Sequence, residues 1–284
     1  VPCDELAQVG GLLGFSLSTV EACRVANKNF RSGVEVYDDY TFTELRITNL
    51  QDKRHDDCVA LYIKKNLIIV VDVEDYDSST KNKFMAAVSR YSYHNVTLEK
   101  VLYAFIDALI ASDFKFIEDR GNEVTLLEED VLKENTDDDF SLDLLTLKKE
   151  LLTLHNYYEQ LLDITDAIEE NENDIFDSDD LHYIANLSAK ITRLREDADS
   201  LSSSVTHLQD AYSSFLDLKL NHTMKIFTVM TSIFFPLTLI VGWYGMNFNS
   251  MPEFAWKYGY LYVIALSVVV VAVLVIIGKR KKWF

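Results

Sequence analysis

The sequence has few of the two residues that most often interrupt regular structure. It contains nine Gly and three Pro among 284 residues, and neither type occurs between Asn122 and Phe235. Gly and Pro are the strongest local breakers of helices and strands. Their absence predicts long helices here, with breaks only in two polar stretches, residues 134–139 and 171–180. Between these breaks, Ser141 to Glu170 is expected to form one helix, with one apolar face made of Leu144, Leu147, Leu151, Leu154, Tyr158, Leu161 and Ile164.

Cysteine and histidine are also scarce. The three Cys residues form no C-x-x-C pair, and the six His residues show neither H-x-x-x-H nor H-E-x-x-H spacing. This pattern argues against a structural zinc site and is typical of reduced thiols in a cytosolic domain. No catalytic constellation is visible, so an enzyme is not expected.

Basic residues are outnumbered. Only one of the 45 acidic side chains and five of the 27 basic ones lie after residue 225. Residues 1–225 therefore carry a net charge of −22. Such a surface repels nucleic acid and attracts cations. A plain role in solubility is an equally good interpretation of the charge.

The first 94 residues have a mixed α/β pattern. Residues 41–47 resemble a strand. In the next strand, which is expected to be half-buried, Val59, Leu61 and Ile63 alternate with the outward-facing Ala60, Tyr62 and Lys64, and Leu67 to Val73 form an apolar, β-branched run typical of a buried strand. Lys64-Lys65-Asn66 is expected to turn the chain between the last two. Helical spacing then predicts a helix from Thr97 to Ala111, with Thr97 as its N-cap.

The stretch after Asp180 has the most regular periodicity. Apolar residues follow a 3-4 spacing from Ile184 to Phe215, which is typical of a coiled-coil seam. No breaker separates this stretch from the apolar run that follows. A single helix from Leu181 to Trp243 would be about 95 Å long, so we expect a stalk that enters a membrane.

Two apolar runs, Ile226 to Trp243 and Gly259 to Gly278, are each long enough to span a bilayer. All three Trp residues lie at the ends of these runs, as in interfacial belts. The basic run 279–282 places the C-terminus in the cytosol by the positive-inside rule. Two spans then put the N-terminal domain in the cytosol and the 244–258 loop outside.

One face of the first span is almost wholly polar or small and continues from the stalk. Counting back from the tip at helical spacing, it comprises Gly242, Thr238, Phe235, Thr231, Thr228, Met224, Asn221, Asp217 and Asp210. Helix packing through Thr and Gly could explain the threonines alone. A row that runs unbroken from stalk to tip favours a pore, which several copies around an axis would enclose.

The tip sequence Tyr244-Gly245-Met246-Asn247-Phe248, the loop Met251-Pro252-Glu253 and the turn Phe235–Thr238 together resemble the CorA family of magnesium channels. The resemblance is close over the C-terminal third and loose elsewhere. It implies an α/β cytosolic domain, a long stalk helix and a two-helix transmembrane hairpin, assembled as a funnel-shaped homopentamer. It also implies Mg²⁺ as both the transported ion and a regulatory ligand that closes the channel from the cytosol.

The resemblance also implies roles for particular residues. Gly245, Met246 and Asn247 would form the selectivity filter, the polar row would line the pore and its inner gate, and Met251, Pro252 and Glu253 would form the outer loop. Phe235 stands where relatives often carry Met. The regulatory carboxylates cannot be placed by alignment; Asp177, Asp179 and Asp180 are weak candidates, since an EF-hand there would need Gly and Glu where His182 and Ser188 stand.

The expected organisation follows from these patterns. The expected segments are an α/β domain (1–135), a helical hairpin (136–180), the stalk (181–225), the pore helix (226–247), the outer loop (248–258), the second span (259–278) and a basic tail (279–284). Alternatives are transport of zinc, cobalt or nickel within the same superfamily, and a membrane-anchored coiled-coil scaffold. Met246 argues against the zinc branch, which tends to lack this Met, and a scaffold has no need for a polar row. The expected location is the inner cell membrane.

Overall fold

The computed structural model describes residues 1–24, 33–49, 56–75, 77–92, 94, 96–136, 139–246, 251 and 256–281. The chain divides into two compact units, Val1–Gln209 and Asp210–Phe284. The helices are α1 (Cys3–Leu13), α2 (Leu17–Ala22), α3 (Ser79–Ser89), α4 (Leu98–Leu109), α5 (Asp113–Leu132), α6 (Phe140–Glu170), α7 (His182–Tyr244) and α8 (Gly259–Arg280). The strands are β1 (Gly33–Val36), β2 (Tyr40–Ile47), β3 (Asp57–Lys64) and β4 (Leu67–Glu74).

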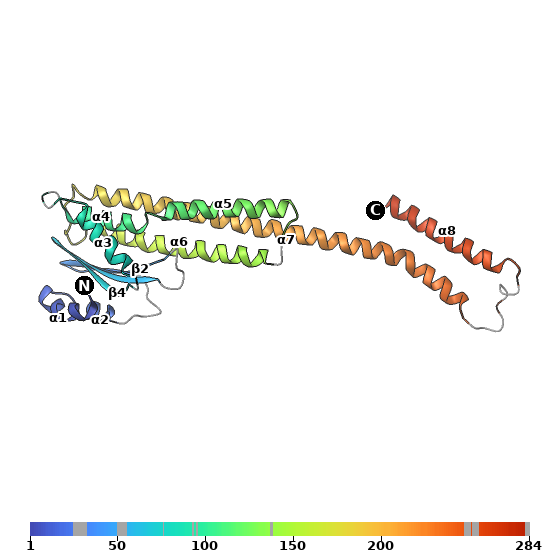
Figure 1. The fold of residues 1–284 in the computed structure, drawn as a ribbon, viewed down its shortest axis with the longest axis horizontal. Coiled ribbons are helices and arrows are strands. Elements are labelled where there is room, and N and C mark those ends of the chain that lie inside the picture. The colour runs from blue at the N-terminus through green and yellow to red at the C-terminus, as the bar shows by residue number, and fades with distance from the viewer. Residues whose placement is uncertain are drawn as a thin grey trace. The chain divides into compact units, whose positions relative to one another are not determined.

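The four strands form one antiparallel sheet in the order β1-β2-β3-β4. The predicted β3–β4 hairpin is confirmed, with Lys64 paired to Leu67. Asn66 has φ 61°, a left-handed conformation that Asn tolerates better than most residues, and this closes the turn. In Figure 1, α1 and α2 lie on one face of the sheet, and α3, α4 and α6 lie on the other.

Burial of the two hairpin strands was predicted wrongly. β3 is buried on both faces, since Val59, Ala60 and Tyr62 are all at most 1% exposed. β4 is mostly half-buried. The reason is tertiary: β3 lies between two neighbouring strands and two layers of helices, whereas β4 is the last strand of the sheet. Leu6 of α1 and Phe15, in the turn between α1 and α2, pack in one cluster with Ala60 and Tyr62.

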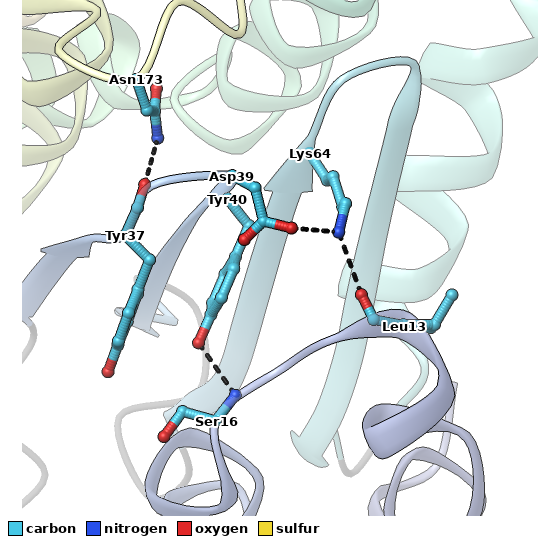
Figure 2. Close-up of polar contacts among 7 residues, drawn as sticks. All are labelled: Leu13, Ser16, Tyr37, Asp39, Tyr40, Lys64 and Asn173. Carbon is cyan, nitrogen blue, oxygen red and sulfur yellow. Dashed lines mark hydrogen bonds and ion pairs between the residues drawn. The ribbon is translucent and has the colours of Figure 1, made fainter.

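Polar contacts hold the N-terminal helices on the sheet (Figure 2). The ammonium group of Lys64, at the end of β3, pairs with Asp39 and donates a hydrogen bond to the carbonyl oxygen of Leu13 at 3.0 Å. The backbone N–H of Ser16 donates to the phenol oxygen of Tyr40 at 3.0 Å. The α1–α2 turn is thereby fixed against strands β2 and β3.

The α6–α7 loop is anchored on the same sheet. The amide of Asn173 donates to the carbonyl oxygen of Tyr37 at 3.1 Å and to the hydroxyl oxygen of Thr41 at 3.0 Å; Figure 2 shows its side chain directed at Tyr37. Asn171 closes the loop by exchanging two hydrogen bonds with the backbone of Phe176. The break predicted at 171–180 is therefore an ordered turn.

The long helices agree well with their predicted periodicity. Helix α6 spans 31 residues and buries all seven members of its predicted apolar face, which are Leu144, Leu147, Leu151, Leu154, Tyr158, Leu161 and Ile164. Helix α7 spans 63 residues, and its seam is buried from Ile184 to Leu208 except at Leu201, which is half-buried like Tyr212 and Phe215 at the end of the predicted seam. An ion pair between Arg195 and Glu159 at 2.6 Å joins α7 to α6, and a ring nitrogen of His155 hydrogen-bonds the Asp199 carboxylate at 2.7 Å.

Gly121 does not mark a structural boundary. Helix α5 runs through it from Asp113 to Leu132. A single Gly inside a helix costs only about 1 kcal/mol relative to Ala, and the helix recovers this by packing buried residues such as Ile117 and Val124. The acidic group at its start is also buried: Asp113 accepts a hydrogen bond from the Tyr158 hydroxyl at 3.2 Å.

Candidate ion pathway

Helix α7 carries the predicted polar row on one continuous surface. All nine members, from Asp210 to Gly242, are exposed in the second unit. Within the first apolar run, the least exposed residues of α7 lie on another face of the helix. They are Val229, Ser232, Ile233, Pro236, Leu237 and Ile240. At 3.6 residues per turn the two faces are centred roughly 160° apart.

The less exposed face looks toward the second span. Leu237 of α7 lines an apolar groove together with α8 residues from Ser267 to Ile276. The polar row is therefore turned away from α8. This is the arrangement expected when one face of the helix lines an aqueous path and the opposite face packs against protein.

The hydroxyl groups of the row share one hydrogen-bond geometry. Thr228, Thr231 and Thr238 each donate to the backbone carbonyl oxygen four residues earlier, at 2.8 Å in every case. Each hydroxyl hydrogen is thereby used within the helix, and the oxygen keeps lone pairs for an outside donor. The row thus presents hydrogen-bond acceptors, which suit the water shell of a cation.

Pro236 interrupts the backbone ladder inside the first span. Proline has no N–H, so the carbonyl oxygen of Ser232 loses its usual partner in the helix. The hydroxyl of Ser232 instead donates to the carbonyl oxygen of Thr228 at 2.7 Å. The carbonyl group that Pro236 frees belongs to Ser232, which lies on the face turned toward α8 and not on the polar row.

Helix α7 ends at the tip sequence. Tyr244 is its last residue, and the backbone N–H of Gly245 still donates to the carbonyl oxygen of Val241 at 2.9 Å. A Cβ atom on Gly245 would come within 2.9 Å of that same oxygen, whereas one on Gly242 would meet open space. Glycine is therefore required at 245 by close backbone approach.

The rest of the tip is only partly described. Met246 is exposed and follows the helix end, and Met251 is half-buried. The predicted filter residue Asn247 and the loop residues Pro252 and Glu253 lie outside the described residues.

The predicted acidic metal ligands of the α6–α7 loop are not gathered into one cluster. Asp177 and Asp180 line a cavity of about 840 Å³ together with Asp174, Glu99 and Lys65. Glu99 is only 5% exposed, and its carboxylate accepts a long hydrogen bond, 3.4 Å, from the backbone N–H of Asp177.

Asp179, by contrast, does not line that cavity; its carbonyl oxygen contacts a ring nitrogen of His182 at 2.8 Å. Among the described residues, the three carboxylates that do come together are Asp57, Asp75 and Asp77. Sequence reasoning missed this group, because its members meet only through the pairing of β3 with β4.

Two helices, α7 and α8, are long and apolar enough to cross a membrane. Together with the four-stranded α/β unit and the long connecting helix, they define a two-span membrane protein with a large extramembrane domain. The family model for the CorA-like Mg2+ transporter protein matches residues 5–280. The chain belongs to this family.

Individual relatives agree with the family assignment. The cobalt/magnesium transport protein CorA of Thermotoga maritima is 27% identical over 288 residues, which cover 99% of this chain and 80% of that protein. The magnesium transport protein CorA of Helicobacter pylori is 25% identical over 81% of this chain and 71% of its own length.

Solved structures share the fold. The complete structure of the CorA magnesium transporter from Methanocaldococcus jannaschii superposes with a TM-score of 0.78 at 22% identity, over 99% of this chain and 88% of that one. Full-length CmaX superposes with a TM-score of 0.72 at 18% identity, over 95% and 82% of the two chains. The α/β domain, stalk helix and terminal helix expected from the sequence are thereby confirmed.

Proposed function

We propose that this protein conducts hydrated Mg²⁺ across a membrane through a pore lined by α7. The observation that carries the proposal is the exposed polar row from Asp210 to Gly242, whose part within the first span is turned away from α8. Family membership and the Mg²⁺ transport named for its relatives support the choice of ion.

The filter at the outer mouth consists of Gly245, Met246 and Asn247. Mg²⁺ holds its octahedral water shell tightly and loses it reluctantly, so a filter must recognise the hydrated ion. Amide and carbonyl oxygens accept hydrogen bonds from those waters without holding the ion as strongly as carboxylates would. Conduction requires binding that is weak enough for release.

One α7 helix cannot enclose a path, so the working unit is a symmetric homo-oligomer. A homopentamer is the state that the family resemblance implies. Each copy turns its polar row to the axis and its α8 toward lipid; α8 is apolar all round between Tyr260 and Ile277, apart from Ser267.

The organisation follows from this pore. Residues 1–135 and 136–180 form the cytosolic domain, 181–225 the stalk, 226–247 and 259–278 the spans, 248–258 the outer loop, and 279–284 the cytosolic tail. The location is the inner cell membrane. The basic residues Lys279 and Arg280, at the end of α8, support a cytosolic C-terminus.

Cytosolic Mg²⁺ closes the channel in this proposal. Asp210 and Asp217, exposed on the inner part of the row, concentrate cations there, and Met224 and Phe235 narrow the path. Divalent ions on the acidic cytosolic domain relieve repulsion between copies and favour the closed state. The loop carrying Asp177 and Asp180 is a candidate regulatory region, so millimolar Mg²⁺ should protect residues 171–180 from proteolysis. Equal digestion with and without Mg²⁺ would exclude this regulation but would not contradict the proposed pore.

The filter is tested by Asn247→Ala in liposomes. We expect selective Mg²⁺ uptake to be lost while the oligomer still assembles, because the substitution removes the amide that would accept hydrogen bonds from the water shell of the ion. Ser267→Ala, on α8, is a matched control that removes a hydroxyl donating within its own helix. Full, selective Mg²⁺ flux through Asn247→Ala would exclude the filter role.

Cobalt is the best-supported second ion, because the Thermotoga maritima relative is named for cobalt as well as magnesium. Nickel resembles both in charge and hydration and belongs in the same comparison. If Co²⁺ or Ni²⁺ lowers Mg²⁺ uptake, the ions share one path; if neither does, the path carries Mg²⁺ alone.

A further inference from the structure

Three carboxylates converge at one end of the sheet, within the first unit. Asp57 is the first residue of β3, and Asp75 and Asp77 follow the end of β4. One oxygen from each lies within 4.8 Å of those of the other two. The antiparallel pairing of Cys58 with Glu74 places the start of one strand beside the end of the next, which brings the group together.

The first ligand is held in place by its surroundings. Asp57 is 4% exposed, and its Oδ2 atom accepts hydrogen bonds from the hydroxyls of Ser79 at 2.9 Å and Thr80 at 3.0 Å, both in the first turn of α3. Burial raises the pKa of Asp57, and the neighbouring Asp75 and Asp77 raise it further.

The second ligand, Asp75, has one carboxylate oxygen without a hydrogen-bond partner. The Oδ2 atom of Asp75 accepts a hydrogen bond from the backbone N–H of Lys81 at 3.1 Å, but its Oδ1 atom is buried from solvent and has no hydrogen-bond partner. A buried carboxylate oxygen without a partner is costly unless a cation or donor meets it. This oxygen therefore points to a ligand independently of the clustering of charge.

The spacing suits a divalent cation with oxygen ligands. Ca²⁺–oxygen distances of about 2.3–2.6 Å allow ligand atoms on opposite sides of the ion to lie about 4.6–5.2 Å apart, and Mg²⁺ requires about 4.2 Å. The ligand oxygens all lie within 4.8 Å of one another, so they are close enough to share one Ca²⁺, Mg²⁺ or Mn²⁺ ion. Asp77 is exposed, so water can complete the coordination.

We propose that Asp57, Asp75 and Asp77 bind one divalent cation per chain, with all three ligands from a single subunit and none from the polar row of α7. The bound ion joins the start of β3, the end of β4 and the first turn of α3, and so stiffens the β4–α3 connection. With three carboxylates and water, the dissociation constant should be on the order of 10⁻⁴–10⁻³ M, the weak end for such sites.

Hydrogen exchange measured by mass spectrometry on the full chain in detergent tests the site locally. The probes are Ca²⁺ and Mg²⁺, each added separately to metal-free protein. At a free ion concentration ten times the dissociation constant, we expect exchange in peptides covering residues 77–84 to slow by roughly tenfold, because opening must first release the ion.

Asp77→Asn is the main variant, because the residue is exposed and its loss should leave the fold intact. Asp75→Asn is the second. Both should lose the ion-dependent slowing, whereas Asp119→Asn, an exposed change of the same charge on α5, should retain it. The proposal is overturned if neither ion slows exchange in the unmodified chain, or if both cluster variants keep the full effect. An ion effect confined to residues 171–180 or α7 would concern gating or the pore and would count against this site.

Discussion

Replacing Thr231 by Val removes one acceptor from the proposed path and changes little else. The two side chains have nearly the same shape, and the lost hydroxyl donates only to the carbonyl oxygen of Phe227, which keeps its place in the helix. Thr231 is exposed on the polar row. The variant therefore reports on the contact between the helix and whatever passes along it.

The expected size of the effect follows from the hydrogen bonds that are lost. Each net hydrogen bond to a water of the hydrated ion contributes about 0.5–1.5 kcal/mol. If the ion uses one or two hydroxyl oxygens of a ring at once, the barrier rises by about 1–2 kcal/mol, which lowers flux about 5- to 30-fold.

The assay is Mg²⁺ uptake into liposomes that contain no internal Mg²⁺, so that regulation does not interfere. Thr231→Ser, which keeps the hydroxyl, should conduct nearly as well as the unmodified protein. Ser232→Ala removes the adjacent hydroxyl from the face turned toward α8 and should have little effect. Unchanged flux in Thr231→Val, or a larger loss in Ser232→Ala, would refute the assignment of the pore face.

Three further predictions concern topology, the tip and pH. A Cys at Ser250 should react with an impermeant thiol reagent from outside the cell, and one at Ser200 should not; the reverse pattern would overturn the orientation. Gly245→Ala should lower flux and disturb the tip, whereas Gly242→Ala should leave the helix end intact, as cross-linking between tips of neighbouring copies would report. Burial raises the pKa of Asp113 to about 6. Its ionisation should therefore lower the free energy of unfolding as pH rises from about 4 to 6, by up to roughly 3 kcal/mol. Asp113→Asn should flatten that part of the profile in urea unfolding, and an identical profile would show that Asp113 ionises without cost.

Most of the correct structural predictions came from local periodicity in the sequence. The seam from Ile184 to Leu208 and the apolar face of α6 were correct, because a helix repeats every 3.6 residues and each position reports on its own face. The two breaks between the long helices were also located correctly, at the acidic, Asn-containing stretches before Phe140 and His182.

Features that depend on contacts between distant segments of the chain could not be predicted from periodicity. Tyr62 was expected on an exposed face, yet it is fully buried under Phe15 and Cys23, residues about 40 positions earlier in the chain. Asp57 and Asp75 lie far apart in sequence, and only strand pairing brings them together. The role of Asn247 came from the resemblance at the tip, and that of the pore row from its helical spacing; both remain proposals.

Uptake of Mg²⁺, Co²⁺, Ni²⁺ and Zn²⁺ into liposomes containing the purified protein tests the proposed transport most directly. We predict saturable Mg²⁺ uptake that Co²⁺ and Ni²⁺ compete with, and that falls when Mg²⁺ is loaded on the cytosolic side. Uptake of Zn²⁺ without Mg²⁺, or no uptake of any of the four ions by an assembled oligomer, would contradict a magnesium channel.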